Sequence, residues 1–168
     1  YYSRTEEGKS YPIFCRRRDA GQGAEEIYLD QNLLAEGHDF HALGGVDVSP
    51  DGRRLIYLED TSGFRDYTLV VKDLESGAEL DRFGEVWNGT AWADDSCTLF
   101  YMTADAAKRG NAVWRHRIGA PRASDVRVFQ EEDVLFEAGL VRSRSGRWIL
   151  IDSDSFSSSE WWGISAAD

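Results

Sequence analysis

Short runs of alternating hydrophobic and polar residues recur along the chain. Segment 46–60 predicts a strand, a turn at Asp51-Gly52, and a second strand through Leu55 and Tyr57. Alternation with a period of two is typical of strands that bury one face. This segment therefore predicts a β-hairpin.

The hairpin pattern occurs three times. A shift of 44 residues places Leu99 on Leu55 and Tyr101 on Tyr57, and a further shift of 50 residues places Ile149 on Leu99. Repeats with a period of 20–50 residues indicate an array of similar structural units. We therefore expect one supersecondary unit per repeat.

Each second strand is followed by a polar loop and a third β-rich run, at 67–71, 112–116 and 160–164. A fourth short strand is predicted at 79–83 and at 126–130. Four strands per repeat is the pattern of a β-propeller, in which four-stranded sheets pack face to face.

The predicted fold class is all-β, a β-propeller fragment with four-stranded antiparallel blades. Two blades are complete, at 44–85 and 88–132, and two are partial, at 1–36 and 138–168. A ring needs about four to eight blades, so we expect part of a larger propeller. Only 31–36 has a helical pattern.

Composition supports a folded, water-soluble domain. Hydrophobic residues make up 42% of the 168 residues and aromatic residues 12%, more than disordered chains contain. No apolar run approaches the roughly 20 residues of a spanning helix, and residues 1–20 lack a signal-peptide core. Cys15 and Cys97 form no disulfide framework. We therefore expect a cytoplasmic protein with no membrane partner.

The net charge of −11 argues against binding to nucleic acid and favours cationic partners. The run 16–18, three arginines, is too short to reverse this, and we expect it to end a strand and protect a sheet edge. The spacing of His38 and His41 could place two imidazoles near an acid, but a zinc site needs three or four ligands and both cysteines lie in other repeats, so neither a metal nor a cofactor is expected. Asn88-Gly89 predicts a turn.

Four blocks of sequence carry a resemblance, at 1–17 (YYSRTEEGKSYPIFCRR), 36–77, 113–119 (VWRHRIG) and 143–151 (SRSGRWILI). In order and spacing they resemble the amino-terminal propeller of the oligopeptidase B branch of the prolyl oligopeptidase family of serine peptidases. The resemblance implies a parent with a seven-bladed propeller over an α/β-hydrolase domain. That domain would cleave short peptides after Arg or Lys.

The chain contains no Gly-x-Ser-x-Gly motif, the turn that carries the nucleophile in such hydrolase domains. We therefore assign no catalytic residue and expect this chain alone to be inactive. The expected role is a lid that gates access to the catalytic domain of the same parent chain. The alternative is a propeller-derived scaffold that binds other proteins and has no peptidase activity.

Most of the negative charge falls in loops that a propeller places on one face, those after second strands and between blades. We expect this acidic face to steer cationic oligopeptides towards the active site. A solvated loop rim is the alternative interpretation. The candidate residues are Glu59, Asp60, Asp66, Asp105, Asp152 and Asp154.

A propeller fragment leaves a sheet face and a sheet edge uncovered at each end, and such surfaces favour self-association. We therefore consider a ring-like dimer of two chains. Trp161 and Trp162 are adjacent in a predicted strand and so point to opposite faces. We expect their rings to pack between blades.

Overall fold

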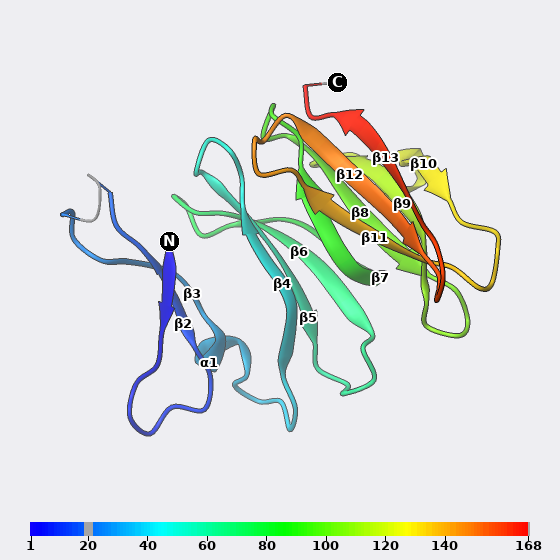
Figure 1. Ribbon diagram of the computed structural model, residues 1–168. Coiled ribbons are helices and arrows are strands. Elements are labelled where there is room, and N and C mark those ends of the chain that lie inside the picture. Colours follow the sequence, from blue (N-terminus) through cyan, green and yellow to red (C-terminus); the bar gives the residue numbers. More distant parts are fainter. Residues whose placement is uncertain (19–21, 168) are drawn as a thin grey trace. The chain divides into compact units, whose positions relative to one another are not determined.

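The computed structural model describes residues 1–18 and 22–167, and the chain divides into two compact units. Unit 1 comprises residues 1–41 and 61–63, and unit 2 comprises residues 42–60 together with those from Phe64 onwards. Almost all regular structure is β-strand (Figure 1). Each unit is described separately below.

Unit 1 holds a three-stranded antiparallel sheet in the order β1-β2-β3 and one short helix. Its elements are β1 (Tyr2–Arg4), β2 (Ile13–Arg16), β3 (Glu26–Asp30) and α1 (Gln31–Leu34). The side chain of Asp30 caps α1 by accepting a hydrogen bond from the Asn32 backbone N–H. The predicted helix is confirmed, although it ends at Leu34.

β2 is the central strand of this sheet, so the expectation that its arginines protect a sheet edge is wrong. Arg16 does end the strand, as expected, and its guanidinium binds the carboxylate of Glu26 on β3, with Nε 2.9 Å from Oε2. The arginine therefore crosslinks two neighbouring strands.

Unit 2 holds ten strands in two sheets. A seven-stranded sheet has the order β10-β9-β8-β7-β6-β5-β4, and a three-stranded sheet has the order β11-β12-β13. The predicted third strands are confirmed as β6, β9 and β13. The elements are β4 (Ala42–Val48), β5 (Arg54–Asp60), β6 (Tyr67–Asp73), β7 (Glu79–Trp92), β8 (Thr98–Ala104), β9 (Gly110–Arg117), the 3-10 helix η2 (Arg122–Ser124), β10 (Val126–Gln130), β11 (Glu137–Arg142), β12 (Trp148–Asp154) and β13 (Ser159–Ser165).

β7 is one continuous strand of 14 residues that serves two groups of strands. Its first half pairs with β6, up to Val86 opposite Tyr67, and its second half pairs with β8, beginning with Trp87 opposite Met102. The seven-stranded sheet is therefore two four-stranded groups that share β7.

The predicted turn at Asn88-Gly89 is wrong, because both residues lie inside β7. Glycine is required at residue 89 because the backbone passes close to the side chain of Met102, and not because the chain turns there. A Cβ atom built at Gly89 would lie 2.5 Å from the Met102 sulfur. The φ of 154° at Gly89 also lies outside the range that other residues prefer.

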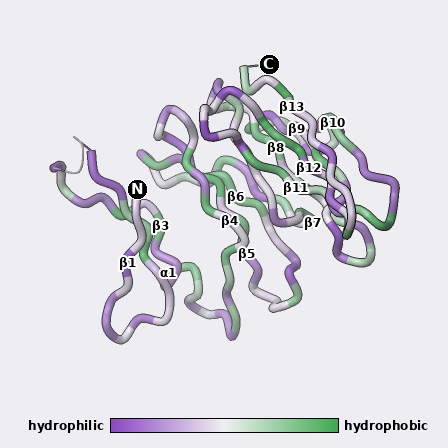
Figure 2. The backbone as a smooth tube through the Cα atoms, viewed as in Figure 1, coloured by the Kyte–Doolittle hydropathy of each residue, from purple (hydrophilic) through white to green (hydrophobic). Residues whose placement is uncertain are grey.

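Two hydrophobic cores lie on opposite sides of β8. Leu99 and Tyr101 contribute to one core with residues of β5, β6 and β7, whereas Phe100 and Met102 contribute to the other with residues of β7, β9, β11 and β12. Because successive side chains of β8 point to opposite sides, both faces of this strand are buried. Figure 2 shows hydrophobic residues along the strands and hydrophilic residues at the connecting turns.

The third group of strands packs on the second. Ile149 and Ile151 of β12 are buried against the core that contains Phe100, and the ring of Trp162 lies 4.8 Å from that of Phe129 on β10. This contact between blades matches the expectation for Trp162, whereas Trp161 is 58% exposed. Stacked antiparallel sheets of this kind are a β-propeller fragment.

Candidate functional site

The six candidate acids lie in the second strands of unit 2 or in the connections that follow these strands. Asp60 and Asp154 are the last residues of β5 and β12. Asp66 comes directly before β6, and Asp105 directly after β8. The hairpin connections of three successive sheets therefore place carboxylates at the same end.

Glu59, Asp66 and Asp105 have cationic partners close by. The carboxylate of Asp66 binds Lys108, that of Asp105 lies 2.6 Å from Arg109, and that of Glu59 lies 2.5 Å from Arg82. Such exposed pairs are each worth only about 0–1 kcal/mol. They reduce the local negative field, although a competing cation can displace them at small cost.

Asp60 has a different role, because its side chain is buried and supports the loop. Its Oδ2 accepts a hydrogen bond of 2.8 Å from the backbone N–H of Arg65. A carboxylate used in this way fixes the path of the loop and is not presented to a ligand.

Asp152 and Asp154 lie in the three-stranded sheet. Asp154 is exposed, whereas Asp152 is half-buried. Burial, followed by the neighbouring charge of Asp154, raises the pKa of the Asp152 carboxyl above its ordinary value.

Asp66 and Asp105 both line a cavity of about 420 Å³, together with residues of β6, β7 and β8. Two aromatic side chains, Tyr67 and Trp87, also line it, and their rings meet edge to face with centroids 6.3 Å apart. Lys108 forms part of the rim. The structure therefore brings two of the six predicted acids into one cavity, and the other four lie outside its lining.

Several residues that line this cavity have a strained backbone conformation. Among the described residues, four other than glycine have a positive φ, and three of them line it: Arg65 at 58°, Glu85 at 57° and Lys108 at 61°. Such conformations cost about 1–3 kcal/mol each and cluster at ligand sites. Sequence reasoning missed this feature, because Arg, Glu and Lys are not residues that indicate a left-handed backbone.

The cavity suits a side chain that is both hydrocarbon and cationic. Aromatic rings pack against methylene groups and attract cations over their faces. The carboxylates of Asp66 and Asp105 supply hydrogen-bond acceptors at the rim. An arginine or lysine side chain has this combination of an apolar stem and a charged end.

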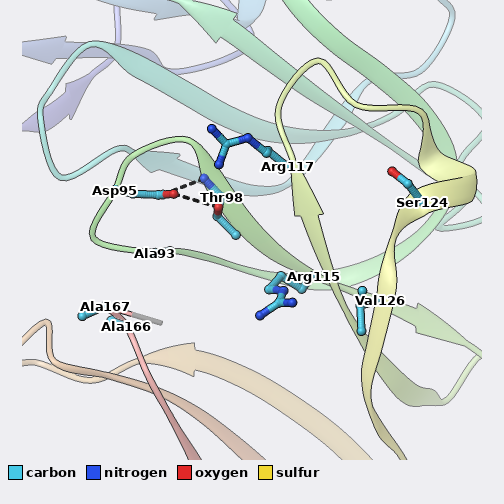
Figure 3. A pocket seen from close by; sticks show the side chains of 9 residues that line it. All are labelled: Ala93, Asp95, Thr98, Arg115, Arg117, Ser124, Val126, Ala166 and Ala167. Atoms are coloured by element: carbon cyan, nitrogen blue, oxygen red, sulfur yellow. Dashed lines mark hydrogen bonds between the residues drawn. The ribbon is translucent and has the colours of Figure 1, made fainter.

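A second cavity of about 370 Å³ opens at the other end of the strands, and its lining is cationic (Figure 3). Arg115 and Arg117 project from β9, and Asp95 is held by hydrogen bonds from the backbone and hydroxyl of Thr98. Although burial acts to raise the pKa of Asp95, hydrogen bonds from the Cys97 and Thr98 amides hold it below the ordinary value. Its two arginines make this cavity unsuitable for a cationic ligand.

One polar cluster is largely buried. Asp125 accepts a hydrogen bond of 2.8 Å from the Tyr101 hydroxyl, and its other oxygen lies 2.7 Å from Nδ1 of His116. Nε2 of the same histidine lies 3.4 Å from Asp81. His116 is 1% exposed, so this histidine contacts no substrate and stabilises the packing of β8 and β9.

Comparison with known proteins agrees with this architecture. A family model described as the prolyl oligopeptidase N-terminal β-propeller domain matches residues 1–168. The chain belongs to the prolyl oligopeptidase family. The resemblance expected from the sequence is therefore confirmed, and the chain is the N-terminal propeller portion of a peptidase of this family.

Individual relatives of the family match almost the whole chain. Dipeptidyl aminopeptidase BI of Pseudoxanthomonas mexicana is 38% identical and protease 2 of Moraxella lacunata 36% identical, each over 95% of the chain and 24% of the relative. Oligopeptidase B from Leishmania major superposes with a TM-score of 0.91 at 30% identity, over 99% of the chain and 24% of that protein. The chain spans about a quarter of the length of these proteins.

Between residues 1–18 and 22–167, no group of three or more His, Cys, Asp or Glu side chains is placed to hold a metal ion. In the same part of the chain, no helix is long and apolar enough to cross a membrane.

Proposed function

We propose that this propeller portion gates and steers substrate for a serine peptidase that cleaves oligopeptides after Arg or Lys. Its partner is the catalytic α/β-hydrolase domain of the same parent protein. The observation that carries the proposal is the cavity that Asp66 and Asp105 line together with two aromatic side chains. The similarity to oligopeptidase B and protease 2 supports the assignment of substrate class.

The charge of this end gives the steering its physical basis. Carboxylates from three hairpin connections create a negative potential that raises the local concentration of cationic peptides. At the cavity, a peptide guanidinium can replace Lys108 on Asp66, because that exposed pair contributes little to stability. Attraction over a distance and binding at the rim therefore act on the same substrates.

Gating follows from the rigid sheets. A scaffold with cores on both faces of β8 does not deform to admit a folded protein, whereas a flexible oligopeptide can pass. Covering a hydrolase site also excludes water and commits the substrate. We place the protein in the cytoplasm, and the free thiols of Cys15 and Cys97 suit a reducing compartment.

The steering is tested in the full-length protein with two variants that change the net charge at the same ion pair in opposite directions. Asp66→Asn removes a negative charge from the rim, and Lys108→Gln removes its positive partner. At low ionic strength we expect kcat/KM for an Arg-containing peptide to fall about twofold to threefold in the first variant and to rise in the second. Glu75→Gln, in the turn between β6 and β7 at the other end, is the matched control.

The dependence of kcat/KM on salt concentration distinguishes long-range steering from a local contact. At about 1 M salt the Debye length is about 3 Å, so the difference between the two variants should disappear. Equal kcat/KM values for both variants at every salt concentration would refute the steering. Failure of the full-length protein to cleave Arg- or Lys-containing peptides would refute the proposed activity.

A further inference from the structure

The second cavity, of about 370 Å³, is lined by two arginines from one strand. Arg115 and Arg117 are two residues apart in β9, so their side chains lie on the same face of the strand. Val113, two residues before Arg115, is buried on that face in the core that also contains Ile149 of β12. The two arginines therefore continue the face of β9 that meets the three-stranded sheet (Figure 3).

Neither arginine has an acidic partner in the part of the chain that the structure describes. Within residues 1–18 and 22–167, the side chains of Arg115 and Arg117 form no ion pair and no hydrogen bond. Arg82, Arg109 and Arg142 of the same unit, by contrast, each bind a carboxylate. The two guanidiniums on the cavity wall therefore keep their charge and their hydrogen-bond donors for a ligand.

Among the described residues that line the cavity, Asp95 is the one acid, and it does not neutralise both arginines. Its Oδ1 accepts hydrogen bonds from the backbone N–H groups of Cys97 at 2.8 Å and Thr98 at 2.7 Å, and its Oδ2 accepts the Thr98 hydroxyl at 2.8 Å. The hydroxyl of Ser124 donates to the Pro121 carbonyl at 2.7 Å. Because these polar groups are already bonded, recognition of a ligand depends on the two arginines.

The spacing of the two arginines suits a tetrahedral anion. Residues two apart in a strand are separated by about 6.6 Å, and each guanidinium presents a planar fork of N–H donors. One such fork is enough for the two oxygens of a carboxylate, whereas the oxygens of a phosphate group point in several directions and accept from two forks. A phosphate monoester also carries a charge of about −1.5 to −2 at pH 7. The arginine pair therefore favours a phosphate group over a carboxylate.

Much of the remaining wall of the cavity is apolar. Val126 pairs with Arg115 across β9 and β10 and is 48% exposed, so its side chain lies next to that arginine without being covered. Ala93, Ala166 and Ala167 extend the apolar wall. A volume of about 370 Å³ lies within the range of small-molecule sites, and a phosphate ion alone fills little of it. A compact hydrocarbon group therefore fits beside the phosphate.

We propose that this cavity binds a small phosphate monoester. Arg115 and Arg117 hold the phosphate group, and the hydrocarbon part of the ligand lies against Val126. The site shares no lining residue with the cavity of Asp66 and Asp105. The inference is therefore independent of the proposed steering.

Calorimetric titration of the full-length protein with phenyl phosphate tests the site. At low ionic strength we expect saturable binding, with inorganic phosphate and benzoate at least about tenfold weaker, because the first lacks the hydrocarbon part and the second the tetrahedral group. Arg115→Gln and Arg117→Gln should each reduce the affinity for phenyl phosphate about tenfold or more, since each removes charge-assisted hydrogen bonds. Arg144→Gln removes the same charge from an exposed turn outside the lining and is the matched control.

Chemical modification of the full-length wild-type protein by phenylglyoxal, which reacts with arginine, needs no variant. With phenyl phosphate at about ten times its Kd, modification of Arg115 and Arg117 should slow about tenfold, and that of Arg144 should not change. This measurement keeps the proposal falsifiable if a glutamine variant does not fold.

Four results would overturn the proposal. They are the absence of saturable binding, an affinity that neither glutamine variant changes, an equal affinity for benzoate, and a failure of phenylglyoxal to reach Arg115 and Arg117 in the unliganded protein. The last result would show that another part of the protein fills the cavity. An equal affinity for inorganic phosphate would overturn the monoester and assign the site to free phosphate.

Discussion

Asp125 holds together two side chains that are almost wholly buried. Its carboxylate accepts the Tyr101 hydroxyl at 2.8 Å and lies 2.7 Å from Nδ1 of His116. Tyr101 is 2% exposed and His116 is 1% exposed, so water cannot replace the carboxylate. Asp125→Ala therefore removes the partner of two buried polar groups in one step.

The expected decrease in the free energy of unfolding follows from the loss of those two contacts. Leaving a buried donor without an acceptor costs about 1–3 kcal/mol, so the two losses together are worth about 3 kcal/mol once some relaxation is allowed. Asp125→Asn keeps the shape and an acceptor oxygen for Tyr101, and its cost is about 1 kcal/mol. For a chain of this size, about 3 kcal/mol lowers the Tm by roughly 6–12 °C.

The assay is urea unfolding of the 168-residue chain, followed by far-ultraviolet circular dichroism and repeated by thermal unfolding. Glu132→Ala removes an exposed acid of equal charge and is the control. The order of free energies of unfolding should be wild type and Glu132→Ala, then Asp125→Asn, then Asp125→Ala. If Asp125→Ala unfolds within about 0.5 kcal/mol of wild type, the buried network does not stabilise the fold as argued.

Two further predictions concern the same sheets. Burial raises the pKa of Tyr101 from 10.0 to about 12. The contribution of the neutral Tyr101 to the free energy of unfolding is therefore fully present below pH 10, and up to about 3 kcal/mol of it is lost between pH 10 and 12. Tyr101→Phe should weaken this alkaline loss in urea titrations, and an unchanged pH profile would contradict the argument. Gly89→Ala should cost about 2 kcal/mol, because the methyl group meets Met102. Gly84→Ala is the control, because its methyl group makes only an ordinary contact of 3.9 Å with the Thr68 hydroxyl. Equal midpoints for the two variants would contradict the crowding argument.

The repeat and its strands could be predicted because alternation reports directly which residues face a core. Leu55 and Leu99 occupy equivalent places in the sequence pattern and in the sheets. The continuity of β7 could not be predicted in the same way. Asn88-Gly89 has the composition of a turn, and only its approach to Met102 explains why glycine is there.

The candidate site was accessible to sequence reasoning only in part. Strand order placed Asp66 and Asp105 at the same end, because both follow a second strand. Their neutralising partners come from elsewhere in the loops, and nothing in the pattern assigns Lys108 to Asp66. The contact between Tyr67 and Trp87 was also missed, because the two residues lie on different strands.

The shared strand β7 gives the seams of unit 2 different mechanical strengths. Opening the seam between the first two groups of strands means bending a single hydrogen-bonded backbone near Glu85. The seam in front of β11 is crossed by one connecting segment, residues 131–136, and is closed by side chains such as that of Ile149 and by a hydrogen bond from the Asp94 N–H to the Ala166 carbonyl. We therefore expect this second seam to separate before the first one when unit 2 is unfolded by force.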